Sequence, residues 1–168
     1  MKLPPNSRVI LGVDPGLATT GWGVIEEVPS GPRMLSFGVI ETPAGQPLPD
    51  RLLRIQLELS LLIRAYQPAV LAIEELFFTK FAVSIAATAQ ARGAILLTAA
   101  MQNIPIVEHN PRAVKMAMTG FGSASKEQMQ LMVQRIFKLK EMPRPDDAAD
   151  ALAIALCHSQ TRQELVAG

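Results

Sequence analysis

Two short apolar segments of this chain each run directly into a carboxylate. Val9 to Val13 is followed by Asp14, and Val70 to Ile73 is followed by Glu74. Continuous apolar runs of this length are typical of strands that are covered on both faces, and acidic side chains are rarely buried in a strand without a partner. In an open α/β sheet, sites form outside the carboxyl ends of parallel strands. If these two strands are neighbours, the two acids should therefore converge.

The remaining apolar pattern predicts further strands and helices in a definite order. Strands are expected at residues 9–13, 21–26, 34–41, 70–73 and 104–107. The turn Pro29-Ser30-Gly31-Pro32 joins the second and third of these, which should pair antiparallel. Helices are expected at residues 50–66 with Asp50 as the N-cap, 82–101, 111–118, 125–139 with Ser125-Lys126-Glu127-Gln128 as a capping box, and 147–160. Because helical crossovers join parallel strands, this order predicts an α/β fold with a five-stranded mixed sheet and helices on both faces.

The length and composition predict one domain that spans residues 1–168. Apolar residues make up 49% of the chain and charged residues 18%, which favours a well-buried core over disorder. No apolar run reaches the length of about 18 residues that a membrane span needs, and the N-terminal residues lack the apolar stretch of a secretory signal. The single cysteine, Cys157, excludes an internal disulfide and a cysteine-based metal cluster. A cytoplasmic location is therefore expected.

The charges are unevenly distributed along the chain. Residues 109–145 contain seven basic and two acidic residues, a net charge of +5, although the whole chain carries only +1. A basic segment beside an acidic remainder is what phosphate binding next to a carboxylate metal site needs. A solvated helix with ordinary surface lysines gives the same pattern, and charge alone does not separate the two interpretations.

A third acidic element opens the last expected helix. Asp147 and Asp150 are three residues apart, so both carboxylates lie on one helix face. The apolar stretch that follows, Ala151 to Cys157, should pack on the sheet. Crowded carboxylates repel one another, and a divalent cation among them removes that conflict. An oxygen-only ligand set favours Mg²⁺ or Mn²⁺, and a pair of such ions suits phosphodiester cleavage.

Each acid also has a plainer explanation. Asp14 precedes Pro15 and Gly16 and could be a turn aspartate. Glu74 could be a surface acid at a strand end, and Asp146 or Asp147 could be only an N-cap. Asp150, inside an apolar helix face, is harder to explain in this way. The two histidines, His109 and His158, are isolated in the sequence and are expected to be structural rather than metal ligands.

The order of these motifs resembles that of the RuvC family of Holliday-junction resolvases. The opening strand and hairpin match in Ile10-Leu-Gly-Val-Asp-Pro-Gly-Leu-Ala-Thr-Thr-Gly-Trp-Gly-Val-Ile25, and the second acid with the aromatic after it in Ala72-Ile-Glu-Glu-Leu-Phe-Phe78. Further matches are Gln90-Ala-Arg-Gly93, Lys115 followed by Gly120-Phe-Gly-Ser-Ala-Ser-Lys126, and Asp147-Ala-Ala-Asp-Ala-Leu-Ala-Ile-Ala155. The resemblance runs in order from about residue 8 to 160, and the tail beyond it is expected to be poorly ordered.

The resemblance implies an RNase H-like nuclease that acts as a homodimer. It implies symmetrical nicking of four-way (Holliday) DNA junctions in recombination and repair, together with the RuvA–RuvB branch-migration complex. It also implies two Mg²⁺ ions per site, with Mn²⁺ able to substitute. The residues that fall on the family's metal-binding catalytic carboxylates are Asp14, Glu74, Asp147 and Asp150, and Lys126 is expected to act beside them. DNA contacts are expected from Phe77, which would stack on an unpaired base, and from Lys80, Arg112, Lys115 and Lys126.

One residue departs from the family pattern. Phe81 stands where the family usually has asparagine, after Thr79 and Lys80. This difference puts local junction contacts or the preferred cut site in question. It does not involve the carboxylates.

A dimer interface is expected on the helix at residues 82–101. Arg92 is its only charged residue, so the helix is apolar around more of its circumference than one buried face requires. A C₂ dimer would place two identical sites on the two strands of a junction. A fully buried core helix would have the same composition.

Three other functions fit part of the pattern. The Asp-Pro-Gly hairpin is similar to the phosphate hairpin of sugar-kinase and actin-like ATPases, but those need two such lobes and 168 residues supply one. An RNase H-like nuclease acting on structured RNA would carry the same carboxylates and would differ in substrate preference. A protein that binds junctions without cleaving them would show no nicking with or without Mg²⁺.

Overall fold

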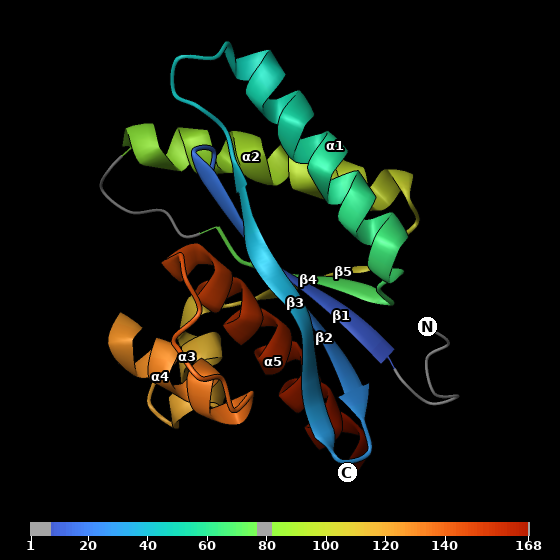
Figure 1. Ribbon diagram of the computed structural model, residues 1–168, viewed down its shortest axis with the longest axis vertical. Coiled ribbons are helices and arrows are strands. Elements are labelled where there is room, and N and C mark those ends of the chain that lie inside the picture. The colour runs from blue at the N-terminus through green and yellow to red at the C-terminus, as the bar shows by residue number, and fades with distance from the viewer. Residues whose placement is uncertain (1–7, 77–81, 168) are drawn as a thin grey trace.

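A five-stranded sheet lies at the centre of the computed structural model, which describes the backbone of residues 8–76 and 82–167 and the side chains of residues 8–76 and 85–161 (Figure 1). Its strands are β1 (Arg8–Asp14), β2 (Thr19–Val28), β3 (Gly31–Glu41), β4 (Val70–Glu74) and β5 (Ile106–His109), in the spatial order β3-β2-β1-β4-β5. β1, β2 and β3 pair antiparallel, whereas β4 pairs parallel with both β1 and β5. The predicted mixed sheet is confirmed.

Helices cover both faces of this sheet. α1 (Leu48–Tyr66) and α2 (Ala82–Met101) lie together on one side, and α3 (Pro111–Thr119), α4 (Lys126–Ile136) and α5 (Asp146–Ala167) lie on the other (Figure 1). The alternation of side chains along β1 explains this division. Val9, Leu11 and Val13 belong to the core under α1 and α2, whereas Ile10 belongs to the core under α3, α4 and α5.

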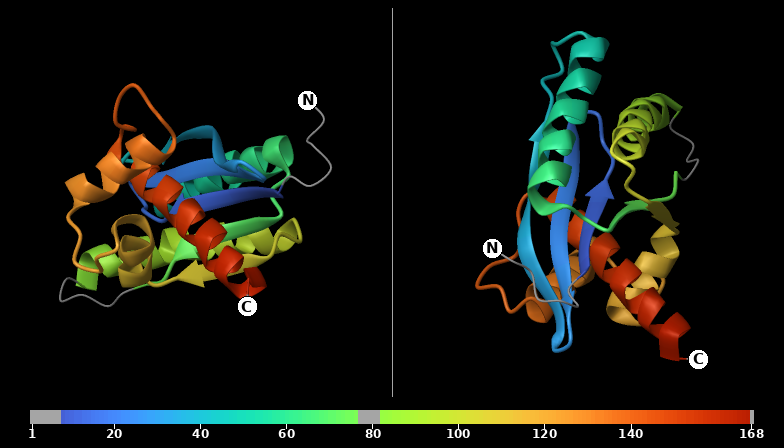
Figure 2. Two further views of the ribbon diagram at one scale, coloured as in Figure 1. Left: turned by 90° about the horizontal axis from the view of Figure 1, so that it is seen from below. Right: turned by 90° about the vertical axis from the view of Figure 1, so that its right-hand side faces the viewer.

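The helix α5 is buried along most of its length. Figure 2 shows it crossing the strands, with β1 and β2 as its main contacts in the sheet. α3 and α4 pack on its outer side, so Leu152, Ile154 and Leu156 are almost wholly removed from water. Burying a side chain of this size stabilises a fold by about 1.5–3 kcal/mol. This packing fixes where the acidic first turn of α5 lies.

Some element boundaries follow the sequence and others differ from it. β2 begins two residues earlier and ends two residues later than predicted, and β3 begins three residues earlier. α5 runs from Asp146 to Ala167, seven residues past its predicted end and into the tail that was expected to be poorly ordered. α2 has the predicted bounds, and the capping box at Ser125 and Gln128 is present. The prediction of Asp50 as an N-cap is wrong, because α1 begins at Leu48 after Pro47 and Asp50 lies in its first turn. β5 begins at Ile106, two residues later than predicted, and α4 ends at Ile136, three residues earlier. Within the described residues, no helix has the length and apolarity needed to cross a membrane.

Candidate active site

The pleat of the sheet turns Asp14 and Glu74 toward α5. Asp14 is two and four residues beyond Gly12 and Ile10, and Glu74 is two and four beyond Ala72 and Val70, so each acid shares a face with residues that pack against α5. The parallel register pairs Val13 with Ile73, which sets the two acids at adjacent strand ends. The expected convergence of these two carboxylates is therefore present.

The first turn of α5 lies directly over β2. A Cβ atom added at Gly21 would lie 1.9 Å from the backbone oxygen of Asp147, and one added at Gly12 would lie 2.1 Å from that of Ala151. Neither position can carry a side chain without moving the helix. Gly21 is the register partner of Asp14 in the antiparallel pair of β1 and β2. The close approach of α5 therefore brings its acidic turn beside the end of β1.

A cleft of about 290 Å³ lies between the sheet, α3, α4 and α5, and Asp147 is not among the residues that line it. Asp14, Glu74 and Asp150 line it together with Lys115 of α3 and Lys126 of α4. The Lys126 ammonium lies 3.2 Å from Asp150 Oδ2 and 3.6 Å from Asp146 Oδ2. The cleft thus has an acidic floor and a basic rim, and the two predicted lysines are both on it.

Burial and like charge perturb the pKa values of the acids in the cleft. Burial, and after it the charges of Asp150, Glu74 and Asp147, raises the pKa of Asp14 from 3.8 to about 8. Burial is also the main cause that raises the pKa values of Glu74 and Asp150. Burial lowers the pKa of Lys126, but the charges of Asp150, Asp146 and Asp147 raise it more, so its pKa is raised overall. The site therefore favours bound positive charge.

The donor set of the cleft suits a hard divalent cation. Its acidic groups are all carboxylates, which Mg²⁺ and Mn²⁺ prefer, and a nearby cation would favour the ionised form of Asp14 against its raised pKa. Among the described residues, no three Asp, Glu, His or Cys side chains already converge into a ready metal-binding group. The carboxylates that line the cleft are of the chemical type that such ions bind.

The comparison with protein families agrees with this geometry. The family model of the crossover junction endodeoxyribonuclease RuvC matches residues 10–158. The chain belongs to the RuvC family. A RuvC of Endomicrobium trichonymphae is 53% identical over 154 residues, which cover 91% of this chain and 81% of that protein. A RuvC of Chloroflexus aggregans is 49% identical over 155 residues, covering 92% of this chain and 94% of that protein.

Solved structures give the same result for the fold. The structure of T. thermophilus RuvC in complex with Holliday junction substrate matches with a TM-score of 0.88 at 35% identity, covering 94% of this chain and 96% of that one. The yeast mitochondrial Holliday junction resolvase Ydc2 matches with a TM-score of 0.66 at 14% identity, over 98% of this chain and 84% of that one. At that identity the second match supports only the fold. The predicted RNase H-like architecture is confirmed.

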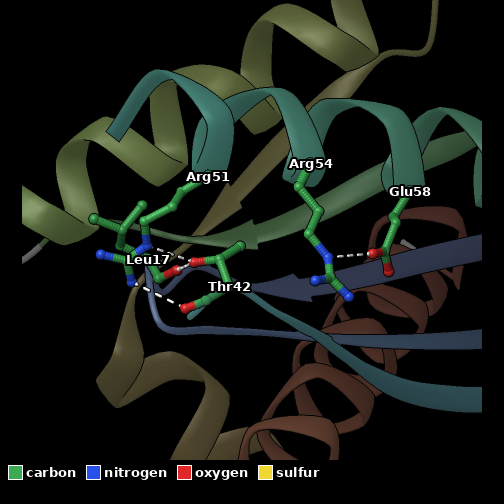
Figure 3. Close-up of polar contacts among 5 residues, drawn as sticks. All are labelled: Leu17, Thr42, Arg51, Arg54 and Glu58. Atoms are coloured by element: carbon green, nitrogen blue, oxygen red, sulfur yellow. Dashed lines mark hydrogen bonds and ion pairs between the residues drawn. The ribbon is translucent and has the colours of Figure 1, made fainter. Parts of the chain in front are cut away.

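The loop after Asp14 is held by polar contacts from two other elements. The Thr42 hydroxyl donates to the backbone oxygen of Leu17, and the Thr42 amide donates to that of Ala18 over 2.9 Å. Arg51 of α1 donates from Nε to the Thr42 hydroxyl (2.8 Å) and from Nη2 to the Thr42 carbonyl (3.2 Å), as Figure 3 shows. Because these bonds fix the loop, they also restrict the end of β1 where Asp14 lies.

Arg92 of α2 is a contributor to the site that the sequence did not identify. Its guanidinium is almost buried, donates to the backbone carbonyl of Glu74, and pairs with Glu108 of β5 over 2.7 Å. It therefore links α2 to the carboxyl ends of β4 and β5. The only signal in the sequence was a single charge on an otherwise apolar helix. The residues around Arg92 do not indicate that it contacts Glu74 and Glu108.

The other predicted residues have mixed outcomes. Arg112 is exposed near the start of α3, one residue beyond Pro111 of the cleft wall. Phe77, Lys80 and Phe81 lie outside the described residues, and their predicted roles stay predictions. The two histidines, isolated in the sequence, meet in the fold: His109 Nε2 lies 3.2 Å from His158 Nδ1 in a buried contact between β5 and α5. Their expected structural role stays a prediction.

Proposed function

We propose that this chain is a metal-dependent endonuclease that resolves four-way DNA junctions by paired, symmetrical nicks. The observation that carries the proposal is that Asp14, Glu74 and Asp150 line one cleft together with Lys115 and Lys126. Membership of the RuvC family supports the reaction, and the structural match to a RuvC bound to Holliday junction substrate supports the substrate. The cellular role would be recombination and DNA repair.

Asp14, Glu74, Asp147 and Asp150 would hold the metal, which we take to be two Mg²⁺ ions with Mn²⁺ as a substitute. Bound there, such ions activate water and stabilise the leaving 3′ oxygen of a phosphodiester. The carboxylates themselves must be ionised to bind, so Asp14 must give up the proton that its raised pKa lets it keep near neutral pH. The Lys126 ammonium, paired with Asp150, would reduce the repulsion between the carboxylates and an entering phosphate.

The basic rim would hold the DNA backbone. Lys115 and Lys126 project from α3 and α4 into the cleft that holds the acids, so each can pair with a phosphate next to the one that is cut. Arg112, near the start of α3, would contact another phosphate of the DNA backbone. Lys80 and Phe77 remain candidates by resemblance alone, Lys80 for a phosphate and Phe77 for stacking on a base at the crossover.

A dimer would give the enzyme two sites related by a two-fold axis. On α1, Leu53, Leu57 and Leu61 follow one another at four-residue intervals and are 55%, 51% and 61% exposed. On α2, Leu97 and Met101 are 60% and 66% exposed. These five residues, which we call the α1–α2 apolar stripe, are unusual on a monomer surface and fit an isologous contact with a second copy. The interface would therefore include α1 as well as the predicted α2.

The partners follow from the family. We expect the dimer to act on junctions delivered by the RuvA–RuvB branch-migration complex, in the cytoplasm. Within the described residues, no sequence or structural feature identifies a binding site for RuvA or RuvB. A pull-down of purified RuvA–RuvB on junction DNA, with and without this protein, would test for a joint complex.

A cleavage assay on synthetic four-way junctions separates the proposal from its alternatives. Paired nicks at symmetrical positions are expected with Mg²⁺ or Mn²⁺ and none with EDTA. Cleavage of structured RNA in preference to junction DNA would favour the RNA nuclease instead. Tight junction binding without nicks in any metal would identify a binding protein. An ATPase function is not favoured, because the fold contains a single lobe of this kind within the described residues.

A further inference from the structure

An exposed aromatic ring stands on the loop between α3 and α4. Phe121 is 71% exposed and is the only aromatic among the exposed large apolar side chains of the described residues. The other tryptophan, tyrosine and phenylalanine side chains in the described part of the chain are at least partly buried. A ring this exposed adds little to the core and leaves most of its surface free to contact a ligand.

The loop that carries Phe121 is held in place by its own hydrogen bonds. The Phe121 amide donates to Thr119 Oγ1 over 3.1 Å, and that hydroxyl lies within bonding distance of the Phe121 carbonyl (3.0 Å) and the Lys115 carbonyl (2.9 Å). The Phe121 carbonyl also accepts from the Ala124 amide over 3.2 Å. Gly120, with φ +78°, turns the chain out of α3 at this point. The ring is therefore presented to solvent by an ordered backbone.

The same loop lies against the wall of the active-site cleft. A Cβ atom added at Gly122 would lie 2.7 Å from Arg112 Cγ and 2.9 Å from Arg112 Nε, so the loop packs on the Arg112 side chain. Arg112 follows Pro111, which lines the cleft. The two helices that the loop joins carry Lys115 and Lys126, both on the cleft rim. Phe121 is thus next to the glycine that packs on Arg112, in the loop between the two helices that carry the cleft lysines.

We propose that Phe121 is a DNA-contacting residue whose ring stacks on a base that is unstacked at the bound junction. The proposal rests on the proposed function, and it adds a contact that lies outside the cleft itself. Cations around an aromatic ring form a common arrangement for binding single strands, because the cations hold phosphates while the ring covers a base. The flanking Arg112, Lys115 and Lys126 supply the first half of that arrangement, and Phe121 supplies the second.

The test is junction binding by single variants, measured by fluorescence anisotropy in EDTA so that no cleavage occurs. Loss of one stacked base weakens binding by about 5- to 150-fold, so Phe121→Ala should raise the Kd for a four-way junction by a factor in that range. Phe121→Tyr should bind within about twofold of the wild type, because every aromatic ring offers a stacking face. Phe121→Leu, apolar but without a ring, should bind nearly as weakly as Phe121→Ala.

Two further readouts distinguish stacking from other effects. The slope of log Kd against log salt should be unchanged in Phe121→Ala, because no phosphate contact is lost. A 2-aminopurine placed at successive positions from the crossover should change its emission at one position with the wild type and not with Phe121→Ala. The matched control is Met116→Ala, since Met116 is a 48% exposed apolar residue of the same helical hairpin. Its Kd should equal that of the wild type.

The inference is overturned if Phe121→Ala binds the junction as tightly as the wild type, or if Phe121→Leu does. It is also overturned if Met116→Ala loses as much affinity as Phe121→Ala, since the effect would then be general to exposed apolar surface. All four variants should have the thermal midpoint of the wild type, because the side chains of Phe121 and Met116 are exposed. Nicking by the wild type is scored separately. A wild type that never nicks refutes the proposed function, whereas a nicking enzyme that is indifferent to Phe121 refutes only this contact.

Discussion

Gly21→Ala is the substitution that most directly tests how α5 positions Asp147 and Asp150, two of the proposed metal ligands. The added Cβ would lie 1.9 Å from the Asp147 carbonyl oxygen and 2.3 Å from its carbonyl carbon, both backbone atoms that no side-chain rotation can move. Side-chain Cβ atoms do not approach other atoms closer than 3.0 Å, so the first turn of α5 must move by at least about 1.1 Å. Asp147 moves with it, and Asp150 follows one turn later.

The expected loss of activity is larger than the loss of stability suggests. Overpacking of this kind costs about 1–3 kcal/mol, which a domain of this size tolerates. A misplacement of about 1 Å in a catalytic group costs about 100-fold in rate. Gly21→Ala should therefore remain folded at 25 °C, with a lowered thermal midpoint, and nick junctions about 100-fold more slowly at saturating Mg²⁺.

Two other glycine variants provide the controls. Gly93→Ala lies on α2 where an added Cβ has nothing within 4 Å, so it should nick normally and gain about 0.5–1 kcal/mol of stability. Gly23→Ala meets the side chain of Leu152 at 2.8 Å, further along α5 from the acids. It should lose stability with a smaller loss of rate. The reasoning is refuted if Gly21→Ala cleaves at the wild-type rate, or if Gly23→Ala loses as much rate as Gly21→Ala.

Four further outcomes are expected. Asp14→Asn should remove Mg²⁺-dependent nicking while junction binding in EDTA stays measurable; wild-type rates would contradict its place as a ligand. Burial raises the pKa of Asp14 from its ordinary 3.8 to about 8 in the folded protein. Between those values the folded state holds a proton that the unfolded state has lost, so the stability of the metal-free protein should fall as pH rises from about 4 to 8, by up to about 1.4 kcal/mol per pH unit. Urea titrations at several pH values would show this fall, and Asp14→Asn should flatten it. Lys126→Ala should reduce the salt slope of junction binding by about 1, whereas Lys138→Ala, outside the cleft, should leave that slope unchanged. Leu57→Glu in the α1–α2 apolar stripe should turn a salt-resistant dimer into a monomer by light scattering; a wild type that is monomeric both free and on DNA would contradict the dimer.

Much of the fold could be predicted because local chemistry and tertiary packing agree along most of the chain. Ser125 caps α4 by hydrogen bonds to its own neighbours, so four residues suffice to recognise that boundary. Asp50 failed as a predicted cap because an acid in the first turn also interacts favourably with the helix dipole, and the sequence does not distinguish the two positions. The start of β5 depends on its pairing with β4, and the Ile104 amide is instead used to close α2 by donating to Ala99.

The site also contains residues that could be predicted from the sequence and residues that could not. Asp14, Glu74 and Asp150 were predictable because an acid at the end of an apolar strand, or on an apolar helix face, requires an explanation. Lys115 and Lys126 were placed by family resemblance rather than by physics. The contact of Arg92 with Glu74 and Glu108 depends on how α2 lies across the strand ends. No pattern within the α2 sequence indicates where α2 lies relative to β4 and β5.

The close packing of α5 on β1 has a consequence for the newly made protein. Asp14 and Glu74 can lie side by side once β1 and β4 have paired, but Asp150 arrives only when α5 docks over Gly12 and Gly21. At about 5–20 residues per second, a ribosome needs roughly 4–15 s to travel from Glu74 to Asp150. During that interval the emerging chain carries two of the four acids that we propose to bind the metal. On the proposed function, a chain in which α5 is absent or undocked should therefore not nick DNA.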